Sequence, residues 1–383
     1  MEVPILKIPF NEAEADWVAG QVKQMLLSGR LAMGGQVQAF EEAFAKFCGV
    51  SRALGCGNGT AALEMICRAL EVAGRSVAVP TNTFMATALA PLAAGARIIL
   101  VDCDPVYFQM DPEDLARKMR PDTRAVILVH IGGFISPAWR RIRAIAENCG
   151  AVFIEDAAHA HGAELPEGRA GSLGTAGAFS FYPTKVLTTA EGGMITTSDP
   201  DLYEALALLR QHGQKRPGSN LHEAFGLNYR PSEIHALLGR VMMDKADWIL
   251  EQRRRAAAVY NRLLTGSPLI PTPAPPEQKP AYYKYPVLLP AGVHRDRLKR
   301  RLKDEFQISL TGEVYSRPLH WQPFWAEHPE ALAAPVSPMP VSEMAARRQI
   351  CLPLYPGLTE EAQVWVVDRL LATVEDESAC ADR

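Results

Sequence analysis

Short runs of apolar residues alternate with segments of helical periodicity from about residue 50 to residue 245. The predicted buried strands are rich in branched apolar residues: "RSVAVP" (75–80), "RIILVD" (97–102), "AVILVH" (125–130), "AVFIED" (151–156), "GAFSFY" (177–182) and "MITTS" (194–198). Helical patterns such as "GTAALEMICRALEVAG" and "PAWRRIRAIAENCG" separate them. This alternation predicts an α/β domain with a mostly parallel central sheet, whose ligands bind at the carboxyl ends of the strands.

The pattern changes after residue 245. "DKADWILEQRRRAAAVYNRLL" has the periodicity of one long amphipathic helix, and the proline-rich "GSPLIPTPAPPEQKP" that follows is typical of a surface loop. We therefore expect a large α/β domain over residues 1–246 and a small C-terminal α+β domain over residues 247–383.

Composition narrows the class of protein. A chain of 383 residues is long enough for two domains, and its net charge of -3 gives no basic surface for nucleic acid or an anionic membrane. The seven cysteines form no CxxC pair and are odd in number, which is typical of a reducing compartment. Without a signal-peptide pattern or a long apolar stretch, the sequence predicts a cytoplasmic protein.

The stretch "GCGNGTAALEMI" is the first candidate for a binding site. Exposed amides at a helix N-terminus favour a phosphate, and the hydroxyl of Thr60 could add a hydrogen bond. A glycine-rich turn capped by threonine has the same pattern, so this stretch alone does not define a site.

A second candidate is "VFIEDAAHAHGA", where an acidic pair ends a predicted strand and two histidines follow. Asp156, His159 and His161 have residue types that bind metals, but no further cluster completes a ligand set, so no metal is expected. The other hypothesis is that Asp156 faces the ring nitrogen of pyridoxal phosphate and keeps it protonated.

Lys185 lies in "SFYPTKVLTTAEGG", one predicted strand after Asp156. A lysine amine can form an imine with an aldehyde only when it is unprotonated, and burial lowers its pKa enough for that. A lysine extending from a buried loop to solvent is the alternative. Phe84, in "PTNTFMATALA", is either a core residue or a ring that stacks on a flat cofactor. Together, the phosphate cradle, carboxylate and lysine are the three parts of a pyridoxal phosphate site.

These motifs resemble the DegT/DnrJ/EryC1/StrS aminotransferases, which belong to fold type I of the pyridoxal phosphate enzymes. The resemblance runs over nearly the whole chain and is carried by "VQAFEEAFAKFCGV", "GNGTAAL", "PTNTFMATA", "EDAAHAHGA", "FSFYPTKVLTTAEGGM", "LLRQHGQ", "FGLNYRPSEIHALLG", "RPLHWQPFW" and "CLPLYPGLTEEA".

The resemblance implies a catalytic core of three residues. Lys185 is similar to the Schiff-base lysine that also shuttles the proton, and Asp156 to the partner of the pyridinium nitrogen. His159 occupies the position that contacts the phenolic side of the ring, and Phe84 that of the stacking aromatic.

The remaining roles also come from the resemblance. Phosphate ligands of the same subunit are implied at Gly59, Thr60 and Ser180, and a phosphate ligand of the other subunit at Asn228, so we expect a homodimer with shared sites. Arg230 and His320 match positions near the substrate.

The implied reaction moves an amino group from an amino acid, L-glutamate or L-glutamine, to a keto-sugar, with a nucleotide-linked deoxysugar as the expected acceptor in amino-sugar biosynthesis. The sugar dehydratase branch of the family has histidine in place of the imine lysine, so Lys185 favours transamination. His159 points to amination at C4, by resemblance only. The alternatives are a pyridoxal phosphate reaction on a keto-cyclitol or an aminated ring precursor, and a regulatory protein that binds the cofactor without turnover.

Two positions depart from the family pattern. The chain reads "HIGG" at 130–133, where "HLYG" is common, so Gly132 replaces a tyrosine near the substrate. This departure makes an altered acceptor possible. Ala190 stands where glycine is common, a change we expect to be tolerated.

Overall fold

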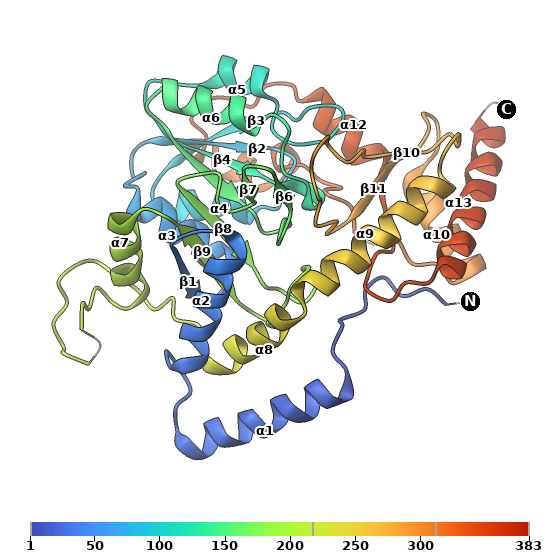
Figure 1. The fold of residues 1–383 in the computed structure, drawn as a ribbon. Helices are drawn as coiled ribbons and strands as arrows, with labels where there is room; N and C mark the ends of the chain where they lie inside the picture. Colours follow the sequence, from blue (N-terminus) through green and yellow to red (C-terminus); the bar gives the residue numbers. More distant parts are fainter. Residues whose placement is uncertain (1, 217, 311, 382–383) are drawn as a thin grey trace.

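A seven-stranded sheet forms the centre of the computed structural model, which describes residues 2–216, 218–310 and 312–381 (Figure 1). The strands lie in the spatial order β1-β9-β8-β5-β4-β2-β3. Their bounds are β1 (Arg52–Cys56), β2 (Ser76–Pro80), β3 (Arg97–Val101), β4 (Thr123–Val129), β5 (Val152–Asp156), β8 (Ala176–Ser180) and β9 (Gly193–Thr197). Because only β9 is antiparallel to its neighbours, the sheet is mostly parallel, as predicted.

Helices cover both faces of this sheet. Because successive side chains of a strand point to opposite faces, each strand contributes apolar residues to the hydrophobic core on either side. In β3, Ile99 and Val101 join one hydrophobic cluster, whereas Ile98 and Leu100 join the other. The first cluster includes α2 (Gly35–Cys48), α5 (Pro112–Lys118), α6 (Trp139–Asn148) and α8 (Glu233–Asp244). The second includes α3 (Gly59–Ala69), α4 (Ala86–Ala93) and α7 (Pro200–Arg210).

All six predicted strands are present, and the predicted fold class is confirmed. The sequence pattern missed β1, whose "RALGC" lacks branched residues other than one leucine. This strand is defined by its pairing with β9, where Leu54 lies opposite Ile195. Local propensity was too weak to reveal a strand that depends on a partner about 140 residues away.

The C-terminal region forms a second, antiparallel sheet from β10 (Ile270–Pro271), β11 (Tyr285–Leu288) and β12 (Gln349–Leu352). It packs with α9 (Ala246–Leu263), α10 (Arg295–Phe306) and α13 (Glu360–Ala381). Helix α9 links the two regions, because Ile249 lies in the core of the large sheet and Tyr260 in the C-terminal core. The division of the chain at residue 246 stays a proposal.

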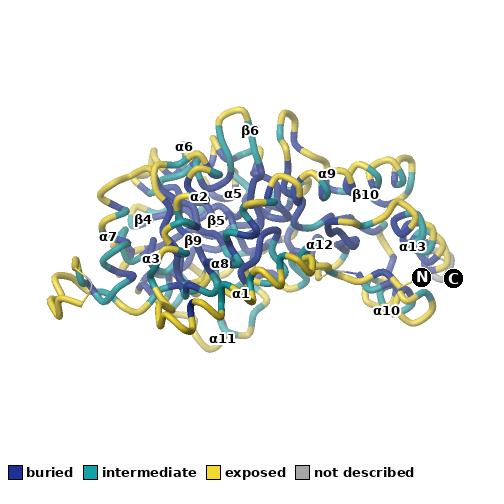
Figure 2. The backbone as a smooth tube through the Cα atoms, turned by 60° about the horizontal axis from the view of Figure 1, so that its bottom comes forward, coloured by how far each residue is buried: buried dark blue, intermediate teal, exposed yellow. Residues whose placement is uncertain are grey.

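The first described residues and α13 both lie on the side of the molecule formed by the C-terminal region (Figures 1 and 2). Val3 is buried there and forms a bridge with Ile308. From there the chain leads into α1 (Glu12–Ser28), which begins at a capping box between Asn11 and Glu14. The remaining elements are short, apart from α12: β6 (Glu164–Leu165), β7 (Gly168–Arg169), η1 (Ile131–Gly133), η2 (Leu319–Trp321), α11 (Phe324–Glu327), η3 (Pro329–Ala331) and α12 (Pro340–Arg348).

None of the helices in the described part of the chain has the length and apolar character that crossing a membrane requires.

Candidate active site

A cavity of about 890 Å³ opens at the carboxyl ends of the parallel strands. Strands β4, β5 and β8 contribute Val129, Asp156 and Ser180 at or next to their last residues, and the loop after β2 contributes Phe84. This is the edge at which open α/β sheets bind their ligands, since the strand ends and the helix N-termini that follow them converge there. The cavity therefore lies where the sequence pattern predicted it.

Lys185 extends into this cavity from the loop between β8 and β9, where its amide donates to the carbonyl of Tyr182 (2.9 Å). The residue is half-buried, and its ammonium lies 4.8 Å from the centre of the Tyr283 ring. Burial lowers the pKa of Lys185 to about 8; Asp156 opposes this shift and the charge of Lys284 adds to it. About a tenth of an amine with this pKa is uncharged at pH 7, far more than for an ordinary lysine, and nucleophilic attack requires the uncharged form.

Asp156 is the last residue of β5 and is 6% exposed. One carboxyl oxygen accepts from the hydroxyl of Thr87 (2.9 Å) and the other from the amide of Ala158 (3.2 Å). Burial raises the pKa of Asp156, while these two hydrogen bonds and the charge of Lys185 lower it. The carboxyl is thus fixed in orientation and has a strong affinity for a proton or a cation.

His159 also lines the cavity and is almost fully buried. Its Nε2 is hydrogen-bonded to the hydroxyl of Tyr315 (3.1 Å), and its ring centre is 4.2 Å from that of Tyr283. Burial, with the charges of Lys185 and Lys284, holds the pKa of His159 well below its usual range, so the imidazole is neutral. Its buried Nδ1 has no hydrogen-bond partner within the described part of the chain.

The start of α3 faces the end of β8 across the cavity floor. Asn58 caps the helix by accepting from the amide of Ala61 (2.8 Å), and Gly59 and Thr60 form its first turn. A Cβ on Gly59 would lie 2.7 Å from the Cβ of Ser180, so only glycine lets these segments approach this closely. The result is a helix N-terminus with two hydroxyl groups nearby, a suitable environment for a phosphate.

Phe84 is 62% exposed at the mouth of the cavity, with its ring centre 6.3 Å from that of Tyr315. Because its ring is this exposed, Phe84 is not a core residue, and its ring is free to stack on a bound ring.

Three of the predicted site residues do not line the cavity of this single chain: Asn228, Arg230 and His320. Asn228 is exposed, and its side chain accepts from the amide of Arg230 (3.4 Å). The Nδ1 of His320 is hydrogen-bonded to the hydroxyl of Thr81 (2.7 Å), at the base of the loop that carries Phe84. Their roles stay predictions.

Sequence reasoning missed Thr87, Tyr283 and Tyr315. Thr87 lies in the first turn of α4, three residues after Phe84, so the start of this helix could have drawn attention to it. Tyr283 and Tyr315 come from the C-terminal region, where no local motif marks them. Tertiary contacts bring them in: the amide of Tyr315 donates to the side chain of Asn82 (2.9 Å), and the hydroxyl of Tyr283 is bonded to that of Thr184 (3.1 Å).

His161, a member of the weighed metal hypothesis, packs among aromatic rings, with its centre 5.0 Å from that of Phe181. Within the ranges that the structure describes, no group of three or more histidine, cysteine or acidic residues has the arrangement of a metal site.

The two departures have structural consequences. Gly132 and Gly133 have φ values of 69° and 94°, and their carbonyls accept from the amides of Lys284 (3.1 Å) and Ala281 (2.8 Å). A Cβ on Gly133 would lie 2.6 Å from the amide nitrogen of Tyr283, so this backbone approach holds the Tyr283 segment against the cavity. Ala190 has a φ of 67°, which explains why glycine is common at this position.

A mostly parallel sheet with a half-buried lysine and a buried carboxyl at one edge is the arrangement of the fold type I transferases. A sequence profile of the DegT/DnrJ/EryC1/StrS aminotransferase family matches residues 13–371. The chain belongs to this family, and the prediction of an aminotransferase is confirmed at that level.

Relatives match over nearly their full lengths. A pleiotropic regulatory protein of Geobacillus stearothermophilus is 35% identical, covering 97% of this chain and 98% of the relative. A dTDP-3-amino-3,4,6-trideoxy-alpha-D-glucose transaminase of Streptomyces venezuelae is 33% identical, covering 95% and 93%. The crystal structure of S. venezuelae DesV in complex with a ketimine intermediate is 31% identical, covers 98% and 99% of the two chains, and superposes with a TM-score of 0.90.

Proposed function

We propose that this chain binds pyridoxal 5'-phosphate in the cavity at the strand ends and transfers an amino group from an amino acid to a nucleotide-linked keto-sugar. The observation that carries the proposal is the pairing of Lys185, whose pKa burial lowers to about 8, with the buried carboxyl of Asp156 in one cavity. When bound, pyridoxal 5'-phosphate supplies an aldehyde that condenses with amines and a ring that accepts electrons from the substrate carbon.

The residues present fit this cofactor. The amides at the start of α3, with Thr60 and Ser180, would hold its phosphate, and the close approach at Gly59 leaves no side chain in the way. Asp156 would accept a hydrogen bond from the protonated ring nitrogen and so keep that nitrogen charged. The buried Nδ1 of His159, unpartnered in the described chain, offers a hydrogen bond to the phenolic oxygen.

Each residue has a defined task in the proposed reaction. The Nζ of Lys185 takes the proton from the α-carbon of the amino donor, holds it within the cavity and returns it. Asp156 keeps a positive charge on the group that faces it, which stabilises negative charge developing on the substrate carbon. The second half of the reaction uses the same groups in reverse order, with the keto-sugar as acceptor.

The substrates follow from the family. The donor we propose is L-glutamate or L-glutamine, and the acceptor is a deoxysugar ketone linked to a nucleotide. The S. venezuelae relative is named for a 3-amino sugar, whereas His159 pointed to C4 by resemblance. A panel of 3-keto and 4-keto nucleotide sugars, with the product position assigned by NMR, decides between the two positions.

We also propose that the enzyme is a homodimer with shared sites. Asn228 lies outside the cavity of its own chain, on a segment that also exposes Phe225 and Leu227 (63% and 40%). A partner chain that covers these apolar side chains would receive Asn228 as a ligand of its phosphate. Arg230, two residues further on, would reach the substrate there, whereas His320 would act within its own subunit through the Thr81 loop.

A regulatory protein without turnover is the second candidate, because the G. stearothermophilus relative carries that name. The intact set of Lys185, Asp156 and His159 favours catalysis, because the adduct itself needs only the amine of Lys185, whereas the buried carboxyl of Asp156 would stabilise charge that develops only during turnover.

One experiment tests the proposed function. The purified protein is incubated with pyridoxal 5'-phosphate, reduced with borohydride and digested, and mass spectrometry is expected to find the adduct on Lys185. Addition of L-glutamate to the unreduced complex should change its visible absorbance and release 2-oxoglutarate. A stable adduct with no response to any amino donor would favour the regulatory protein, and the absence of any adduct at Lys185 would exclude both.

A further inference from the structure

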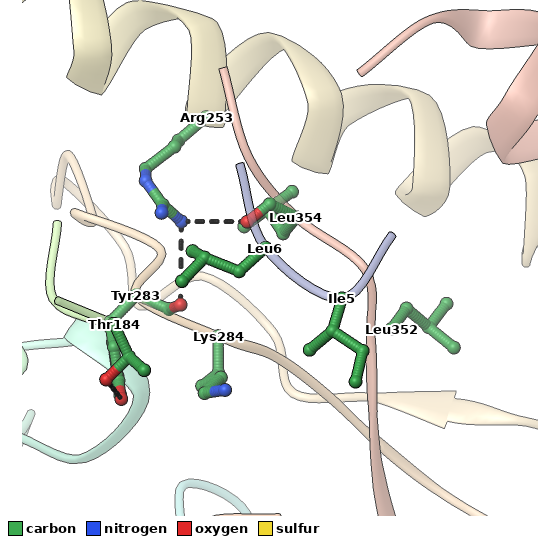
Figure 3. Close-up of a pocket in the computed structure, with 8 residues that line it drawn as sticks. All are labelled: Ile5, Leu6, Thr184, Arg253, Tyr283, Lys284, Leu352 and Leu354. Atoms are coloured by element: carbon green, nitrogen blue, oxygen red, sulfur yellow. Dashed lines mark hydrogen bonds between the residues drawn. The ribbon is translucent and has the colours of Figure 1, made fainter. Parts of the chain in front are cut away.

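Tyr283 adjoins both the active-site cavity and a smaller cavity of about 30 Å³. Tyr283 and Thr184 line both cavities, and their hydroxyl groups are hydrogen-bonded to each other. The smaller cavity is also lined by Arg253 and Lys284 (Figure 3). Tyr283 therefore lies at the boundary between the two cavities, where Lys185 lines the larger cavity and Lys284 and Arg253 line the smaller one.

Two ammonium groups lie near this one ring. The Nζ of Lys185 is 4.8 Å from its centre and the Nζ of Lys284 is 5.2 Å from it. The two charges are thus no more than about 10 Å apart, which is within the screening length of physiological salt or close to it. Both side chains are half-buried, so their repulsion is screened less than that between two exposed charges.

The side chain of Lys284 has no close counter-charge. It is half-buried, it points away from Arg253 in Figure 3, and no carboxylate in the described part of the chain is within ion-pair distance of it. The acid that acts on it, Glu313, is already paired with Lys299 of α10. The amide of Lys284 donates to the carbonyl of Gly132 (3.1 Å), which fixes the backbone of this residue beside the cavity.

The other charged and titratable groups around the two lysines come from several elements. Arg253 of α9, Cys351 of β12, Glu313 and Lys299 act on Lys284. On the other side of the ring, Asp156 attracts the charge of Lys185, and the two buried histidines of the cavity region, His159 and His161, are both affected by it. Among these groups, Lys284 is the one whose positive charge disfavours the protonated form of Lys185. It does not line the active-site cavity itself.

We propose that Lys284 is a positioning residue whose charge, acting across the ring of Tyr283, favours the uncharged form of the Lys185 amine. The proposal rests on the proposed role of Lys185 in catalysis, but the electrostatic effect itself exists without cofactor or substrate. Removal of the charge at residue 284 should therefore leave Lys185 protonated over a wider pH range.

The test uses the cofactor-free protein. Trace labelling with acetic anhydride between pH 6 and pH 10, followed by mass spectrometry of the peptide that contains Lys185, gives the pKa of this amine. In the Lys284→Met variant we expect this pKa to rise by roughly half to one unit. At pH 7 that shift means about three- to ten-fold less uncharged amine.

Two further variants separate charge from structure. Lys284→Arg keeps the charge and should leave the pKa of Lys185 where it is in the wild type. Lys279→Met is a matched change at an exposed lysine five residues before Lys284, whose charge is paired with Glu164. It should also leave the pKa of Lys185 unchanged. An unshifted pKa in Lys284→Met, or equal shifts in the Met and Arg variants, would overturn the proposal.

Activity is measured separately, so the two proposals fail in different ways. If Lys185 does not bind pyridoxal 5'-phosphate, the proposed function is wrong, but the labelling result still reports on Lys284. If the cofactor binds and the pKa of Lys185 is the same in the wild type and in the Lys284→Met variant, only the electrostatic proposal fails.

Discussion

The two walls of the active-site cavity differ in origin and in how they could be recognised. The wall on the large sheet carries Asp156 and Lys185 on strand ends and adjoining loops, where the alternating pattern of strands and helices predicted a site. The wall from the C-terminal region carries Tyr283 and Tyr315, which reach the cavity through long-range packing. We infer that the first wall performs the chemistry and that the second tunes it, so substitutions in the two walls should have effects of different size.

The largest effect is expected at Lys185. Lys185→Ala removes the amine that we propose moves the proton, and steady-state turnover should fall to background, because general acid–base catalysis and imine formation would depend on the same atom. Mass spectrometry after borohydride treatment should find no adduct at this position. Turnover close to that of the wild type would show that the chemistry does not depend on this wall.

Asp156→Asn should have the next largest effect. The amide keeps the shape of the side chain and the contact with Thr87 but cannot hold a positive charge opposite it. A loss of about 4 kcal/mol of stabilisation corresponds to a fall in kcat of roughly 10³-fold. Stopped-flow measurement of the half-reaction with amino donor checks this, and an unchanged rate would contradict the assigned role of the carboxyl.

Tyr315→Phe tests the C-terminal wall. It removes the hydroxyl that is bonded to His159 Nε2 and leaves a second buried ring nitrogen without a partner. The cost of about 1 kcal/mol should appear as a fall in kcat of roughly five-fold, with the fold unchanged by circular dichroism. A loss as large as that of Asp156→Asn would mean that both walls take part directly in the chemistry.

The smallest effect is expected at Ala190, outside both walls. Its φ of 67° is strained for a residue with a Cβ, which costs about 1–2 kcal/mol of stability. Glycine would relieve this strain but would lose about 0.5–1 kcal/mol because it is more flexible in the unfolded chain. Ala190→Gly should therefore raise the free energy of unfolding by roughly 0.5–1 kcal/mol in urea denaturation. Destabilisation would mean that the methyl group makes contacts that outweigh the strain.

The sequence by itself determined the mostly parallel sheet, the position of the site at its carboxyl edge, and Lys185, Asp156 and the Gly59 turn as one group, whereas His159 was added by the family resemblance. Local features are sufficient for these, because strand ends meet at one edge of a parallel sheet whatever else the chain does. Only the tertiary structure decided which residues complete the cavity. Tyr283 lies beside Lys185 because the backbone of Gly132 and Gly133 forms hydrogen bonds with the segment that carries Tyr283. Tyr315 lies beside His159 because the side chain of Asn82 accepts a hydrogen bond from its amide. Such contacts join segments more than 140 residues apart, and their free energy comes from packing that no local pattern records.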